Sequence, residues 1–286
     1  MNILKFNKVQ IVGCKEMKEL LKNMSEPVSQ AASNLANPLT KSIGQTLSDL
    51  WDFSLGSHLS LARNKQNYRQ AKKYEQYKET IDSKMQNIPQ ENLIEPPLHI
   101  VGPALEASRF YIEADELKEM FANLIASSMD SRRISQVHPS FTEIIKQLSP
   151  LDAANIELFK KDKDYPICDY RVSYEGGKGH NTLATNIFLE NPDVQDLALQ
   201  ATSISNLMRL GLIESPNNVY RIQPGAYEKF KETGVYKELV MDLSKYIEDG
   251  VIDKDGQITI YRRLVRLTPM GADFMEAVFR DEQVEI

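Results

Sequence analysis

Apolar residues recur every three or four positions along much of the chain, which is the spacing of amphipathic helices. The first such face lies in residues 42–62, and its members are Ile43, Leu47, Leu50, Trp51, Leu55 and Leu59. We expect Pro38 and Gly44 to limit the start of this helix. The stretch 63–85 is rich in strong helix formers and holds neither glycine nor proline, so it predicts a second helix.

This second stretch is also basic and aromatic. It carries seven Lys or Arg residues against three acids, a net charge of +4, with Tyr68, Tyr74 and Tyr77 interleaved. One interpretation is an arm that contacts phosphates and stacks bases on its tyrosines. We favour a solvated helix whose tyrosines rest on neighbouring residues, because charged faces are common on exposed helices.

The most regular helical pattern lies at 116–130, in the sequence ELKEMFANLIASSMD. Its apolar face comprises Leu117, Met120, Phe121, Leu124, Ile125 and Met129, which match the 3.6-residue period. Another side carries only small residues, among them Ala122 and Ala126, and we expect it to contact a helix of another subunit or of this chain. Further helices are predicted from Pro103 to residue 111, over 141–148 and over 151–161.

The pattern changes in the last part of the chain. Alternating apolar and polar residues predict a strand at 165–174 that leads into a glycine-rich loop, a short strand at 218–222 and a strand over 257–268 after a hairpin turn at Gly256. Helices are predicted between these strands and at the C-terminus. The segments LGLIE and LTPMG are similar to those that join helix and wing in winged-helix domains.

Together these patterns predict a mainly α, α+β protein in three regions. Residues 1–92 form an N-terminal helical region and residues 93–148 a helical core. Residues 149–286 form a winged-helix-like domain with a small β-sheet. Winged-helix domains bind proteins as well as DNA, so the likeness does not predict DNA binding.

Composition excludes several classes of protein. The net charge of −6 is unlike that of a protein that coats nucleic acid. The two cysteines, Cys14 and Cys168, have no partner at metal-binding or disulfide-framework spacing, which indicates idle thiols in a reducing cytosol. We expect neither a secretion signal nor a transmembrane helix, because no sufficiently long apolar run occurs.

Local motifs give no catalytic or metal site. The sequence DKDGQITI would need an oxygen ligand and a bidentate carboxylate where Val251 and Arg262 stand, so it is not a calcium loop. The sequence EGGKGH lacks phosphate-loop spacing, and the four histidines have no second His or Cys one helical turn away. We therefore predict no cofactor and more readily a non-enzyme than an enzyme, although distant residues can assemble a site in the fold.

Two stretches carry a family resemblance. They are IPQENLIEPPLHIVGPALEASRFYIEADELKEMFANLIASSMDSRR, residues 88–133, and VHPSFTEIIKQLSPLDA, residues 137–153. In these motifs the chain resembles the Abi-alpha family of abortive-infection proteins. The resemblance implies a bacterial or phage-associated cytoplasmic protein that defends against phage. It carries over no catalytic residues.

Three hypotheses follow. The first is a non-enzymatic defence protein that acts through protein contacts, as a homo-oligomer and with an unknown phage or host protein. The second is a nucleic-acid-binding regulator that uses Arg262, Arg263 and Arg266 beside the wing, although residues 187–286 carry 17 acids and 11 Lys or Arg residues. The third is an effector that perturbs the inner membrane from its periphery through residues 39–73, with Trp51 and Leu55 as contact residues.

Overall fold

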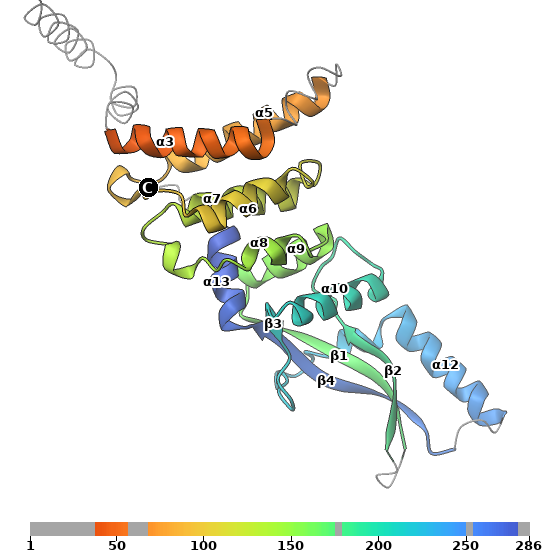
Figure 1. Ribbon diagram of the computed structural model, residues 1–286. Coiled ribbons are helices and arrows are strands. Elements are labelled where there is room, and N and C mark those ends of the chain that lie inside the picture. The colour runs from red at the N-terminus through yellow and green to blue at the C-terminus, as the bar shows by residue number, and fades with distance from the viewer. Residues whose placement is uncertain (1–37, 57–67, 175–178, 250–253, 280–286) are drawn as a thin grey trace, which may run out of the picture.

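Figure 1 shows a computed structural model in which stacked helical layers lie against one end of an antiparallel sheet. The structure describes residues 38–56, 68–174, 179–249 and 254–279. The predicted α+β class is confirmed. One hydrophobic core runs from Ile43 in the first described helix to Val278 in the last, and thus includes residues of all three predicted regions.

The first layer contains helices α3 (Pro38–Trp51) and α5 (Tyr68–Gln86), with a π-helical turn η1 (Asp52–Gly56) after α3. The predicted limit at Pro38 is confirmed, because α3 begins at this residue, which is well suited to a first helical turn. The predicted limit at Gly44 was wrong, because Gly44 lies inside α3. Trp51 and Tyr77 pack with ring centroids 5.8 Å apart, and Leu55 is fully buried. The amphipathic face is therefore a packing face, while residues 57–62 of the predicted helix lie outside the described residues.

Below this layer, α6 (Leu98–Ser108) and α7 (Asp115–Ser128) form the centre of the core (Figure 1). The prediction of α7 is confirmed, and Phe121 is fully buried. The predicted start of α6 at Pro103 was wrong. The helix begins five residues earlier, where the carbonyl of Pro97 accepts hydrogen bonds from the first turn. Pro103 therefore lies inside the helix, where its missing N–H removes only one hydrogen bond.

The next elements lead from the core to the sheet. They are the 3₁₀ turns η3 (Ile134–Gln136) and η4 (Leu158–Lys160), with helices α8 (Phe141–Ile145), α9 (Pro150–Glu157) and α10 (Leu197–Arg209). A further 3₁₀ turn, η2 (Gln90–Asn92), precedes α6. Ser149 and Asp152 form a reciprocal capping box that begins α9. Buried Asn155 then donates to Gln200 and Ser203, so hydrogen bonds join α9 to α10.

The last helix, α13 (Pro269–Val278), returns to the core and packs against α7 (Figure 1). Asn123 donates to the carbonyl of Val278 over 2.8 Å, and Ser127 donates to that of Ala277 over 2.9 Å. These bonds satisfy carbonyls at the C-terminal end of α13, which have no partner within the helix. The small-residue side of α7 thus contacts a helix of the same chain.

The sheet has the strand order β2-β1-β4-β3, and each pair of neighbours is antiparallel. Its strands are β1 (Asp164–Ser173), β2 (His180–Ile187), β3 (Ile213–Glu214) and β4 (Gln257–Leu267). The strands predicted at 165–174 and 257–268 are confirmed, whereas β2 was not predicted. The strand predicted at 218–222 was wrong, since that segment has no strand partner.

Helices α11 (Glu228–Lys231) and α12 (Gly234–Glu248) precede β4. The sequence predicted one continuous helix here, but the Thr233 side chain caps α12 through the N–H of Tyr236 and separates the two. Because α12 and not a strand comes before β4, the turn at Gly256 is not a hairpin turn.

The two faces of the sheet have different covers. On one face, Cys168 and Tyr170 pack against Tyr227 and Phe230, which come from the α11 region. Burial raises the pKa of the Cys168 thiol, consistent with the predicted idle cysteine. On the other face, Tyr165 and Ile167 continue into the helical core. This second face connects the sheet to α9, α10 and α13.

Candidate interaction surface around Arg221

The connection between β3 and α11, residues 215–227, contains neither helix nor strand. Between a turn at 217–218 and a bend at residue 223, residues 219–222 run without turn or helix. Its two prolines, Pro216 and Pro224, lie on either side of this run. Arg221 is the only charged residue in the connection.

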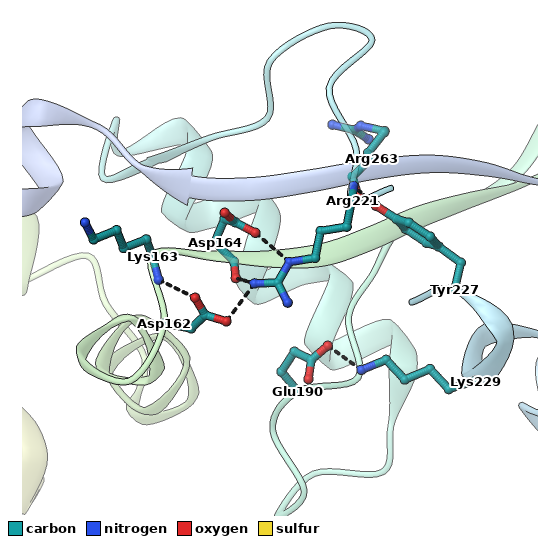
Figure 2. Close-up of polar contacts among 8 residues, drawn as sticks. All are labelled: Asp162, Lys163, Asp164, Glu190, Arg221, Tyr227, Lys229 and Arg263. Carbon is teal, nitrogen blue, oxygen red and sulfur yellow. Dashed lines mark hydrogen bonds and ion pairs between the residues drawn. The ribbon is translucent and has the colours of Figure 1, made fainter. Parts of the chain in front are cut away.

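The Arg221 side chain is fixed to the start of β1 (Figure 2). Its Nε donates to Oδ1 of Asp164 and its Nη2 to Oδ2 of Asp162, each over 2.6 Å. The Nη2 group also donates to the main-chain carbonyl of Asp164. Asp162 is oriented in turn, because its other carboxylate oxygen accepts the N–H of Lys163 over 2.8 Å. We call these contacts the Arg221 clamp.

Electrostatics keep the clamp ionic at neutral pH. The hydrogen bond from Arg221 lowers the pKa of Asp162 below its usual range, and the hydrogen bond to Asp162 raises the pKa of Arg221. Charge-assisted hydrogen bonds of this type are about twice as strong as neutral ones. The positive charge of Arg221 is therefore satisfied within the protein and is not offered to a ligand.

A tyrosine fixes the backbone of the same segment. The hydroxyl of Tyr227 accepts the N–H of Arg221 over 3.1 Å and donates to the carbonyl of Arg263 over 2.6 Å. Tyr227 itself is buried, and burial raises the pKa of its hydroxyl, so it remains a protonated donor. The hydroxyl of Tyr227 thus joins residues 219–222 to the edge of β4.

The clamp turns apolar side chains toward solvent. With Arg221 held inward, its neighbours Tyr220 and Ile222 are 46% and 86% exposed, and Val219 is 39% exposed. Within the described part of the chain, the backbone N–H groups of Tyr220 and Ile222 have no hydrogen-bond partner. A segment whose single charge is paired within the protein, and whose backbone N–H groups are free, is suited to bind another polypeptide.

A second ion pair holds the neighbouring helix. Lys229 of α11 donates to Glu190, which follows β2 (Figure 2). The two ends of the connection are thus fixed to different parts of the sheet region. These contacts hold segment 215–227 in place, so it is not a free loop.

The three arginines predicted for a nucleic-acid contact do not form one patch. Arg263 donates to Asp169 and Asn186 over 3.0 Å each. Arg266 is paired with Glu214 over 2.8 Å. Arg262 is exposed and lies 5.7 Å from the centre of the Tyr227 ring, on the opposite face of β4 from Arg263.

The other predicted contact residues are buried. Trp51 and Leu55 lie in the core beneath α3, and Lys78 covers the Trp51 ring at 5.9 Å. Ala122 and Ala126 are fully buried in α7. In α7, the interhelical hydrogen bonds come from Asn123 and Ser127 instead.

Two further features bear on the kind of site. Among the described residues, no group of three or more His, Cys, Asp or Glu side chains is placed to hold a metal ion. No helix in the described ranges is both long enough and apolar enough to cross a bilayer.

The structure is that of an α+β protein with an exposed segment, residues 215–227, held in place by the Arg221 clamp. Comparison with protein families then identifies the chain. The family model described as abortive infection alpha matches residues 69–278, and the chain belongs to this family. The match includes the core helices and the whole described sheet. No curated protein and no solved structure matched the chain.

Proposed function

We propose that this protein acts in abortive-infection defence against phage through protein contacts, without an enzymatic step, and in the cytoplasm of a bacterium. Membership of the family supports the defence role. The observation that supports the contact mechanism is the exposure of Tyr220 and Ile222 on a backbone that the Arg221 clamp holds in place. Segment 215–227 would be the docking element for a partner protein.

Ordering a flexible loop on binding costs free energy, and a clamped segment avoids much of that cost. Large apolar side chains at the centre of a contact also contribute most of its affinity. Both points favour this segment over exposed apolar residues on regular helices, such as Leu199 on α10. Leu199 is 55% exposed and provides a matched control.

The test is a phage challenge of bacteria that express the full chain. We expect the wild-type protein to protect the culture at low phage dose and to stop growth of infected cells at high dose. Ile222→Asp should lose protection while its melting temperature is unchanged, and Leu199→Asp should retain protection. Absence of protection by the wild type would contradict the defence role. Equal protection by wild type and Ile222→Asp would contradict the docking element.

Nucleic-acid binding and membrane perturbation are two alternative functions with less support from the structure. A winged-helix arrangement would use α10, β3, β4 and α13, and a nucleic-acid contact would rely on Arg262, since Arg263 and Arg266 are already paired with carboxylates. Duplex DNA binding that weakens steeply with added salt would support it. Membrane perturbation would require Trp51 and Leu55 to leave the core, which liposome flotation of wild type and Trp51→Ala can measure.

A further inference from the structure

We infer that residues 219–222 pair with the same residues of a second copy of this chain, in a symmetric antiparallel ladder. This inference rests on the proposed function, because it names the partner of the docking element. It also gives the expected homo-oligomer a specific interface. It is supported by the Arg221 clamp, by the hydrogen bonds of the Tyr227 hydroxyl to Arg221 and Arg263, and by the exposure of Tyr220 and Ile222.

Charge favours a second copy as the partner. In a two-fold symmetric contact a surface meets itself, so any unpaired charge near the axis meets the same charge. The chain has a net charge of −6, which makes most self-contacts repulsive. From Ser215 to Tyr227 the only charged residue is Arg221, and two carboxylates bind it. This segment therefore lets two copies meet without bringing unpaired like charges together.

Backbone direction sets the register. The Arg221 side chain is held inward while those of Tyr220 and Ile222 are exposed, which is the alternation of an extended backbone. Because the N–H of Arg221 donates to Tyr227, we expect the N–H groups of Tyr220 and Ile222 to point to the other side of this run. In an antiparallel pair, residues opposite each other both direct their backbone groups toward the partner or both away from it. Tyr220 of one copy therefore lies opposite Ile222 of the other, with the two-fold axis at Arg221. Each dimer contains this aromatic–aliphatic pair twice.

The length of the contact sets its strength. Pro216 and Pro224 limit the run that can pair, because proline has no N–H to donate to a ladder. A short ladder with two apolar pairs buries less surface than a permanent dimer interface does. The dimer is therefore concentration-dependent, and the clamp supports it by lowering the entropic cost of pairing.

Sedimentation velocity of the full chain over a dilution series tests the inference with two matched variants. Tyr220→Lys with Ile222→Lys places like charges opposite each other, and should weaken dimerisation by about tenfold or more. Tyr220→Lys with Ile222→Glu has the same number of charged substitutions but places Lys opposite Glu, and should retain a dimer. Both sites are exposed, so the variants should keep the wild-type melting temperature and circular dichroism.

Three results would overturn the pairing. They are a wild-type protein that is monomeric at all concentrations, a Lys–Lys variant that dimerises like the wild type, and a Lys–Glu variant as monomeric as the Lys–Lys variant. The phage challenge separates this failure from failure of the proposed function. A wild type that protects but is monomeric would contradict the dimer and leave the defence role. A wild type that forms the dimer but does not protect would contradict the defence role and leave the dimer.

Discussion

The hydroxyl of Tyr227 donates a hydrogen bond to the carbonyl of Arg263 over 2.6 Å, and the same oxygen accepts the N–H of Arg221 over 3.1 Å. The hydroxyl therefore joins the backbone of segment 215–227 to the backbone of β4. Tyr227→Phe keeps the ring, which stacks on Phe230, but removes both bonds. We expect a loss of about 1–3 kcal/mol in the free energy of unfolding, measured by urea denaturation.

A control separates this loss from a general effect of removing a tyrosine hydroxyl. Tyr220→Phe changes the same group on an exposed side chain and should alter stability by less than about 0.5 kcal/mol. Hydrogen exchange adds a local measurement, since the amide of Arg221 should exchange faster in Tyr227→Phe. An unchanged exchange rate at Arg221 would show that the hydroxyl does not hold this backbone in solution.

Replacement of Arg221 tests the ionic half of the clamp. Arg221→Gln leaves Asp162 and Asp164 without their shared donor. All three side chains are partly exposed, so solvent screening limits the expected loss to about 1–2 kcal/mol. Lys231→Gln removes an exposed pair with Glu228 and should cost less than about 0.5 kcal/mol. Equal effects of the two variants in urea denaturation would rank the clamp as an ordinary surface pair.

The clamp also predicts a pH dependence with a definite sign. The pKa of Asp162 is lower in the folded protein than the value of about 3.9 expected in the unfolded chain. The stabilisation it provides is therefore complete above about pH 4 and is lost as the pH falls through the lowered pKa. The difference in unfolding free energy between wild type and Arg221→Gln should shrink below about pH 4. A constant difference between neutral and acidic pH would contradict this origin.

Helical periodicity predicted the core well, because the spacing of apolar residues along the chain determines which face of a helix is buried. The pattern at 116–130 gave the bounds of α7 to within two residues, and all six residues of its predicted apolar face are buried, since this face meets neighbouring helices. The sheet was harder to predict. Seven of the eight residues of β2 are exposed or half-exposed without clear alternation, and its pairing with β1 is irregular, so no period of two marks it.

The candidate surface was predicted only as a strand. The β-branched and aromatic residues around Arg221 favour an extended backbone, and the backbone there is indeed free of helix and turn. The sequence could not indicate that the hydroxyl of Tyr227 would stand between this run and β4. Nor could it indicate that Asp162 and Asp164, almost sixty residues earlier, would neutralise the arginine. Such pairings depend on tertiary structure alone.

The arginines of β4 provide a test of the nucleic-acid alternative. Arg263 binds Asp169, which is buried and also contacts Arg171. Arg263→Ala should therefore destabilise the fold by about 1–3 kcal/mol through lost charged hydrogen bonds. Arg262→Ala removes the same charge from an exposed position and should cost less than about 0.5 kcal/mol. If Arg263→Ala were neutral in thermal denaturation, its side chain would be free to serve a ligand.

A glycine explains why the segments LGLIE and LTPMG occur together in this chain. The Thr268 side chain accepts the N–H of Gly271 and donates to the carbonyl of Gly211, which fixes the start of α13 against the end of α10. A Cβ atom at Gly271 would lie 1.9 Å from the carbonyl oxygen of Leu212, so the backbone must shift to admit it. Gly271→Ala should lower the free energy of unfolding by about 1–3 kcal/mol or more.

Gly102 is the matched control for this substitution, because it lies inside α6 with no atom within 4 Å of an added Cβ. Gly102→Ala should raise stability by about 0.5–1 kcal/mol, as alanine loses less backbone entropy in a helix. Opposite signs for the two variants in chemical denaturation are the expected result. A neutral Gly271→Ala would mean that the start of α13 is not packed against Leu212 in solution, and that the two segments are joined in another way.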